Sequence, residues 1–391
     1  MAQTESSRTL NLFGFMILLF WMALYAYQPQ LSVYAGTLGA GISMTGVILS
    51  SYGLTQMLLR LPTGILSDMM KKRKLFILFG NIFAVLSALG LFFAKTPVML
   101  LIFRMLSGAA ASLWVVMTVT FSGYYPKEDA PKAMSRLMIF NKCGCLLGMV
   151  LGGVLSDTFS VKASFIMSIA AAGAALVLGL YIKEPDMTGV TPLRLREFPS
   201  VLGNRSLILF SIMALMVQVV EQGTTLGFVP KYASELGASG SALGILSGAS
   251  IFGGMCASYA LSGWLLRRFK AGTIVTAGCI VFTLTAVLLP FLAKTVSVII
   301  VFQFLAGFGN TLCFALLNGF AISGFDGRLR GAAMGVFQSV YALGMFLGPL
   351  LTGVLSDHFS IASGIAVSGL LGGIPLILLS LFAFRRKNAD S

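Results

Sequence analysis

Three stretches of the chain carry no charged residue over a length that matches the thickness of a lipid bilayer. They run from Leu75 to Ala94 (20 residues), from Ala163 to Ile182 (20 residues) and from Ala271 to Ala293 (23 residues). A helix of roughly 20 apolar residues crosses the hydrocarbon core, whereas a strand of a membrane barrel is about half as long and alternates polar with apolar residues. These runs therefore predict transmembrane helices.

The rest of the chain divides into similar segments. Hydrophobic residues make up 57% of the sequence and charged residues only 10%, against about 25% charged residues in a typical soluble domain. A water-soluble fold has no core large enough to bury so much apolar surface. The sequence predicts an all-α membrane protein with twelve transmembrane helices.

The basic residues are distributed unevenly between the two sides of these helices. With twelve alternating spans, 20 of the 27 Lys and Arg residues fall on one side and 4 on the other, and Arg60, Arg104 and Lys142 lie within spans. The positive-inside rule then places both termini and the long central loop in the cytoplasm, with the protein in the cell membrane. Anionic lipid headgroups account for the net charge of +14, so we expect no nucleic-acid partner.

The two halves of the sequence repeat each other. Gly-Val-Leu-Ser-Asp at Gly153 to Asp157 recurs at Gly353 to Asp357, a shift of 200 residues. Two apolar helices can resemble each other by chance, but chance would not put the polar pair Ser-Asp at the same position in both. The repeat predicts two pseudo-symmetric six-helix bundles, residues 1–182 and 205–391, joined by a polar cytoplasmic linker at residues 183–204. Parallel halves of this kind suit a transporter that rocks about a central site, and we expect it to be a monomer.

The loop after the second predicted span carries a recognisable motif. It reads Gly-Ile-Leu-Ser-Asp-Met-Met-Lys-Lys-Arg from Gly64 to Arg73. This resembles the signature of the major facilitator superfamily between its helices two and three. The matching positions are Gly64, Asp68, Lys72 and Arg73, whereas Met69 and Lys71 depart from the family pattern. The resemblance implies a cytoplasmic gate formed by these four residues, in which Asp68 pairs across the halves in one conformation. The alternative for Asp68 is an ordinary solvated loop charge.

Two further segments are similar to motifs of the same family. Arg104 to Gly108 resembles the Arg-then-Gly motif of helix four that is linked to proton coupling. Gly144, Gly148, Gly152 and Gly153 resemble the glycine-rich motif of the family's antiporters, with Met149 in place of its proline. The resemblance therefore points to the branch of proton-coupled drug and metabolite antiporters, although glycines at this spacing are also typical of close helix packing.

One acidic residue, Glu221, lies well inside a predicted span. An ionisable group within the membrane is by default a candidate functional group. Glu221 can take up a proton from one side and release it to the other as access alternates, with Arg104 and Lys142 as its partners in transport and coupling. The competing interpretation is a static ion pair between Glu221 and Arg104 or Lys142.

Polar and amphipathic residues within the spans are candidates for the wall of the solute cavity. They are Trp21, Tyr25, Arg60, Trp114, Asn141, Gln218, Gln222, Gln303, Asn310 and Gln338. The three basic residues within the spans, Arg60, Arg104 and Lys142, outnumber the one acid, Glu221. If all four face the cavity, they favour an anionic or zwitterionic solute. Aromatic residues near helix ends are equally often anchors at the membrane interface.

Transport driven by an ion gradient is the function that these features favour. We expect efflux of a drug-like compound or metabolite against protons, with the proton gradient as the energy source and no cofactor. The alternatives are a proton-coupled importer of an organic anion or sugar, and a membrane sensor that transports nothing. We find neither an ATP-binding phosphate loop nor paired catalytic acids, and with the single His358 no metal cluster, so we do not expect an enzyme or a metal site.

Overall fold

The computed structural model describes residues 7–126, 129–185, 201–325 and 329–379. Within these ranges, twelve helical segments are long and apolar enough to cross a membrane. The predicted all-helical membrane fold is confirmed.

The N-terminal half contains the first six spans. In chain order its helices are α1 (Ser7–Tyr25), α2 (Gln28–Thr37), α3 (Ile42–Met70), α4 (Arg73–Phe93), α5 (Pro97–Ser112), α6 (Trp114–Ser122), α7 (Ala130–Thr158) and α8 (Val161–Leu180). The pairs α1–α2 and α5–α6 each form one span.

The C-terminal half repeats this arrangement. Its helices are α10 (Arg205–Val220), the π-helical segment η3 (Glu221–Phe228), α11 (Val229–Glu235), α12 (Gly240–Ala260), the π-helical segment η4 (Leu261–Leu265), α13 (Leu266–Arg268), α14 (Ala271–Leu292), α15 (Val296–Ser323), α16 (Arg330–His358), α17 (Ile361–Leu370) and the short 3₁₀ turn η5 (Leu371–Gly373). The last span continues to Leu379.

The first and seventh spans depart from a regular α-helix at equivalent places: the first breaks between Tyr25 and Gln28, and the seventh passes through the π-helical segment η3. Pro29 lies in the first turn of α2 and Pro230 in the first turn of α11. Proline has no N–H and clashes with the preceding turn, so it kinks or breaks the helix on its N-terminal side. Helices α2 and α11 each begin one residue before their proline, and the seventh span extends to Glu235.

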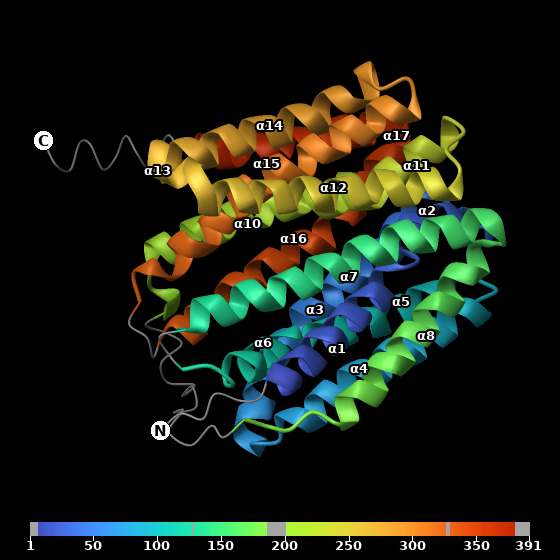
Figure 1. Ribbon diagram of the computed structural model, residues 1–391. Coiled ribbons are helices and arrows are strands. Elements are labelled where there is room, and N and C mark those ends of the chain that lie inside the picture. The colour runs from blue at the N-terminus through green and yellow to red at the C-terminus, as the bar shows by residue number, and fades with distance from the viewer. Residues whose placement is uncertain (1–6, 127–128, 186–200, 326–328, 380–391) are drawn as a thin grey trace, which may run out of the picture.

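The two halves lie side by side, with the N-terminal half in blue to green and the C-terminal half in yellow to red (Figure 1). The interface consists mainly of α3 packed against α16 and of α7 packed against α12. The repeated Gly-Val-Leu-Ser-Asp sequences form the last turns of α7 and α16, so the internal repeat is also a repeat of the interface.

Two equivalent hydrogen bonds join the halves at one end of this interface. The Ser43 hydroxyl donates to Asp357 Oδ2 over 2.7 Å, and the Ser241 hydroxyl donates to Asp157 Oδ2 over 2.8 Å. Ser43 and Ser241 lie in the first turns of α3 and α12, and the two aspartates lie in the last turns of α16 and α7. We call these four residues the Ser–Asp seal.

Glycines bring the backbones together next to the Ser–Asp seal. A Cβ atom on Gly46 would lie 3.0 Å from Gly353 Cα, and one on Gly244 would lie 3.0 Å from Gly153 Cα. Only residues without side chains allow helices to approach this closely. At this end the halves are therefore closed by direct backbone contact as well as by hydrogen bonds.

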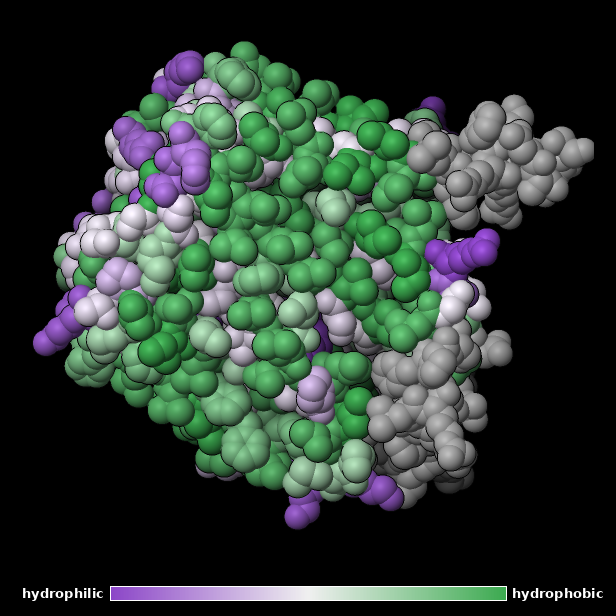
Figure 2. All heavy atoms as spheres, turned by 180° about the vertical axis from the view of Figure 1, so that it is seen from behind, coloured by the Kyte–Doolittle hydropathy of each residue, from purple (hydrophilic) through white to green (hydrophobic). Residues whose placement is uncertain are grey.

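The outer surface is apolar where a bilayer would surround it. Figure 2 shows a face that is largely hydrophobic across the middle of the molecule, with hydrophilic residues gathered toward its ends. Phe93, Phe252 and Phe291 are among the large apolar side chains that are more than half exposed. Such a surface is unfavourable in water and favourable in lipid.

Candidate transport site

Glu221 begins the π-helical segment of the seventh span. Asn310 on α15 donates a hydrogen bond from its side-chain amide to the Glu221 carboxylate. The Gln303 amide, two turns earlier on α15, donates to the Thr225 carbonyl over 2.8 Å. Short π-helical segments inside α-helices occur frequently at functional sites. This segment begins at the predicted acid, whose carboxylate contacts α15.

A side chain from the opposite half reaches the backbone that this distortion exposes. Pro230 has no N–H, which leaves the Leu226 carbonyl without its usual donor four residues later. Gln28 Nε2, on α2 of the N-terminal half, lies 3.5 Å from that carbonyl oxygen. Helix α2 of the N-terminal half therefore meets the π-helical segment that begins at Glu221.

Lys142 approaches Glu221 from the N-terminal half. It lies on α7, half-buried next to the buried Asn141, and interacts electrostatically with the Glu221 carboxylate. Among the side chains that the structure describes, no Lys or Arg nitrogen lies within ion-pair distance of Glu221. The carboxylate is thus close to a cation without being bound to it in this conformation.

Arg104 is buried within the N-terminal half. Its guanidinium donates to Gln28 Oε1 over 2.5 Å and to the Tyr27 hydroxyl over 3.3 Å, and it lies 4.3 Å from the centre of the Tyr52 ring. A cation over an aromatic face is stabilised by the quadrupole of the ring. The structure therefore surrounds Arg104 with Tyr27, Gln28 and Tyr52. The static ion pair between Arg104 and Glu221, one of the two alternatives from the sequence, is not formed.

Arg60 connects the two halves. It lies on α3, donates to the Tyr341 hydroxyl of α16 over 2.8 Å, and donates to Gln56 Oε1 one turn earlier on its own helix. Only 5% of the Arg60 side chain is exposed, so it does not extend to the aqueous surface.

Three predicted aromatic residues form one cluster in the N-terminal half. The Trp21 ring lies 5.3 Å from the Trp114 ring and 5.8 Å from the Tyr25 ring, measured between centroids. Tyr25 also interacts electrostatically with Arg104 and Glu221. The cluster lies within the first and fourth spans, near Arg104 and Glu221. We call these buried aromatic and charged residues, together with Arg60, Lys142, Asn310 and Gln303, the polar centre.

The remaining cavity candidates lie on the C-terminal half. Gln218 and Gln222 flank Glu221 and are half-buried, and Gln338 on α16 is half-buried as well. No described contact joins Gln338 to Glu221. The structure therefore joins Asn310 directly to Glu221, places Gln303 against the same π-helical segment, and leaves Gln338 apart from them.

The predicted gate lies at the junction of α3 and α4. Lys71 adopts a left-handed backbone conformation (φ 50°) that ends α3, and α4 begins at Arg73. Lys74 Nζ donates to the Leu180 carbonyl over 2.6 Å, which ties the start of α4 to the end of α8. Gly64 lies on α3 and Lys72 caps α4, whereas the side chain of Asp68 lies outside the described part of the structure.

Several residues of this centre were not predicted from the sequence. Tyr52 and Gln56 precede Arg60 by eight and four residues, so the three form one stripe along α3. A polar stripe of this period within an apolar span is a signal that the sequence does contain. Gln28 and Tyr341 are brought in by the broken helix and by tertiary packing, for which the sequence offers no local signal.

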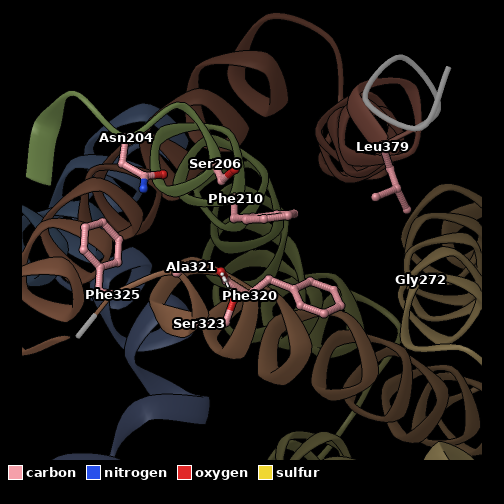
Figure 3. Close-up of a pocket in the computed structure, with 10 residues that line it drawn as sticks. Asn204, Ser206, Phe210, Gly272, Phe320, Ala321, Ser323, Phe325 and Leu379 are labelled. Carbon is pink, nitrogen blue, oxygen red and sulfur yellow. Dashed lines mark hydrogen bonds between the residues drawn. The ribbon is translucent and has the colours of Figure 1, made fainter. Parts of the chain in front are cut away.

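A separate pocket of about 410 Å³ lies in the C-terminal half, at the end opposite the Ser–Asp seal (Figure 3). Its wall is mostly apolar and includes Phe210, Phe320 and Phe325, with Asn204 and Ser206 at the start of α10. Glu221 lies eleven residues beyond Phe210, about 16 Å along a helix. This pocket is therefore distinct from the polar centre.

A fold of two six-helix halves around a polar centre defines a membrane transport protein. The sequence model of the Major Facilitator Superfamily matches residues 13–226 and 212–391. The chain belongs to this superfamily, whose members are transporters and not enzymes.

Two relatives of known source match most of the chain. An uncharacterized MFS-type transporter, MJ1560 of Methanocaldococcus jannaschii, is 26% identical over 356 residues, which cover 86% of this chain and 88% of the relative. The quinolone resistance protein NorA of Staphylococcus aureus is 24% identical over 374 residues, which cover 93% of this chain and 94% of NorA.

Solved structures share the fold at low sequence identity. The nucleoside transporter NupG superposes with a TM-score of 0.72 at 15% identity, covering 95% of this chain and 98% of NupG. A bacterial homolog of the human lysosomal transporter Spinster, in an inward-facing and occupied conformation, gives a TM-score of 0.75 at 15% identity, covering 98% of this chain and 97% of that one.

Proposed function

We propose that this transporter exports a drug-like compound or metabolite in exchange for protons, with Glu221 as the residue that carries the proton. The observation on which the proposal rests is the position of Glu221. It is partly accessible at the start of a π-helical segment, it accepts a hydrogen bond from Asn310, and it lies near Lys142 of the opposite half without an ion pair. The similarity to a quinolone resistance protein supports a drug-like solute.

The exchange follows from competition at one carboxylate. Solute that enters from the cytoplasm displaces the proton from Glu221, which leaves to the cytoplasm. After the protein opens outward and the solute departs, Glu221 takes up an external proton and the empty transporter returns. Lys142 favours the deprotonated carboxylate when it is near, so movement between the halves changes the proton affinity of Glu221. The basic residues of the loops support a cell-membrane location with both termini inside.

We expect Glu221→Gln to abolish solute transport driven by a pH gradient. Glutamine keeps the size of the side chain and can still hydrogen-bond Asn310, but it cannot exchange a proton at neutral pH. The measurement is solute flux into proteoliposomes under an imposed pH gradient, with a quinolone and a panel of dyes as solutes. The sign of the gradient that accelerates the flux gives the direction of exchange.

The matched control is Glu235→Gln. Glu235 lies on the same span, at the exposed end of α11, and loses the same charge. Wild-type flux in this variant together with background flux in Glu221→Gln supports the proposal. If both variants respond to the gradient like the wild type, Glu221 does not couple transport to protons.

We expect Asp68→Asn to slow transport severalfold without lowering the amount of folded protein in the membrane. The loop motif places Asp68 in the last turn of α3, where a carboxylate can hold the halves together in one conformation. Asp129→Asn, at the exposed start of α7, removes a charge from a nearby loop and serves as the control. Equal rates in the two variants would mean that Asp68 has no gating role.

A further inference from the structure

The polar centre contains more positive than negative charge. Arg60 and Arg104 are 5% and 3% exposed, Lys142 is half-buried nearby, and Glu221 is the acid among them. No carboxylate of the described residues lies within ion-pair distance of either arginine. A charged side chain inside a membrane costs about 2.5 kcal/mol or more even on lenient scales, so this excess calls for a compensating anion.

Arg60 and its neighbour Gln56 each leave a donor unused. Arg60 donates from its two terminal nitrogens to Tyr341 and Gln56, but its Nε has no acceptor. Gln56 uses its oxygen to accept from Arg60, which fixes the orientation of the amide, and its Nε2 has no acceptor either. Gln56 is 1% exposed, so water at the surface does not satisfy it. Buried donors without partners are uncommon in folded proteins and indicate that a partner is missing.

These donors need a hydrogen-bond acceptor that the protein does not supply. The Nε of Arg104 also has no acceptor, and Tyr52 interacts electrostatically with both Arg60 and Arg104. Guanidinium groups bind carboxylate and phosphate in a planar, bidentate geometry. The N-terminal half therefore presents buried positive charge and unused donors on neighbouring faces of α3 and α5.

The C-terminal half presents the opposite chemistry. Glu221 carries negative charge, and Gln303 donates its amide to Thr225 and leaves its Oε1 without a partner. Gln303 is 1% exposed, so this acceptor is buried as well. A solute held between the halves thus meets donors on one side and acceptors on the other.

We propose that the transported solute is a zwitterion, whose anionic group binds Arg60 and Gln56 and whose cationic group faces Glu221. This inference rests on the proposed export function, because the solute has to enter the polar centre. The anion would compete with Tyr341 for the Arg60 guanidinium and so weaken a bond that joins α3 to α16. A ligand shifts a conformational equilibrium only through contacts that differ between states, and this bond is such a contact.

The experiment measures binding of three matched probes to the purified protein at constant pH, without a gradient. They are 4-(aminomethyl)benzoate, which is a zwitterion, 4-methylbenzoate, which is an anion, and the methyl ester of the first, which is a cation. The readout is the midpoint of thermal unfolding at increasing probe concentration. We expect the wild type to be stabilised by both carboxylates, and most strongly by the zwitterion.

The variants separate the two ends of the site. Arg60→Gln should weaken apparent binding of both carboxylates about tenfold or more, while its response to the ester stays unchanged. Glu221→Gln should keep the response to 4-methylbenzoate and lose the additional stabilisation that the zwitterion gives the wild type.

Gln56→Leu keeps the Arg60 charge and should weaken carboxylate binding less than Arg60→Gln does, which provides a second test if Arg60→Gln does not fold. Arg136→Gln, which removes an arginine at the start of α7, is the control for loss of positive charge.

The proposal is overturned if neither carboxylate stabilises the wild type, or if Arg60→Gln and Gln56→Leu both bind the carboxylates as the wild type does. Because no gradient is applied, these outcomes are independent of proton coupling. Flux that ignores the pH gradient would refute the role of Glu221 as proton carrier and would leave the anion-binding result standing.

Discussion

Gly152→Leu is expected to destabilise the N-terminal half. A Cβ atom at Gly152 would lie 1.8 Å from the Ala26 carbonyl oxygen, and the clash is with backbone, which has no rotamer to change. Helices α1 and α7 would have to separate at the point where α1 gives way to α2. Overpacking of this kind costs about 1 to 3 kcal/mol, and a larger side chain at a backbone contact lies at the upper end of that range. The measurement is the midpoint of thermal unfolding of the detergent-solubilised protein, which should fall by several degrees.

Gly173→Leu is the control for this prediction. It also replaces a helical glycine of the N-terminal half by leucine, but a Cβ atom there meets nothing within 4 Å. Removing glycine from a helix interior stabilises it by about 0.5 to 1 kcal/mol where there is room. Equal midpoints for the two variants would show that α1 and α7 are not packed as closely as the structure has them.

Valine at both Gly46 and Gly244 is expected to abolish transport while leaving each half folded. Every close neighbour of a Cβ atom at these positions belongs to the opposite half: Pro349 and Gly353 for Gly46, Met149, Val150 and Gly153 for Gly244. The double variant therefore prevents the halves from closing beside the Ser–Asp seal and traps the protein with this end open. Hydrogen–deuterium exchange should rise severalfold in the first turns of α3 and α12, with little change in the thermal midpoint.

Gly319→Val separates this effect from a general loss of helical glycine. Gly319 is exposed on α15 and a Cβ atom there has no neighbour within 4 Å. Replacing Asp157 and Asp357 together by asparagine should open the same end to a smaller degree, because exposed hydrogen bonds contribute less than backbone contact. Protection of α3 and α12 that is unchanged in the valine variant would contradict the assignment of this contact as a gate.

The helical spans and the two halves were predictable because each depends on a pattern that recurs along the chain. Charge-free runs such as Leu75 to Ala94 fix the spans, and the repeated Gly-Val-Leu-Ser-Asp fixes the six-plus-six organisation. The same repeat also placed Asp157 and Asp357 at equivalent helix ends. It did not identify Ser43 and Ser241 as their partners, because these bonds arise only when the halves close against each other.

The sequence predicted the charged residues of the polar centre but not their hydrogen-bond partners. Glu221 and Arg60 are conspicuous in apolar spans, whereas the contact of Arg60 with Tyr341 depends on the packing of α3 against α16. The π-helical segment that begins at Glu221 also escaped prediction. It depends on support from Gln28, Gln303 and Asn310, which come from two other spans.

The central claim, that Glu221 exchanges protons for solute, is tested most directly by measuring protons that the solute itself moves. Vesicles without a pH gradient are loaded with a pH-sensitive dye, and solute is added on one side only. The wild type should move protons against the solute flow, Glu235→Gln should do the same, and Glu221→Gln should produce no change in pH. A pH change of wild-type size in Glu221→Gln would contradict the claim.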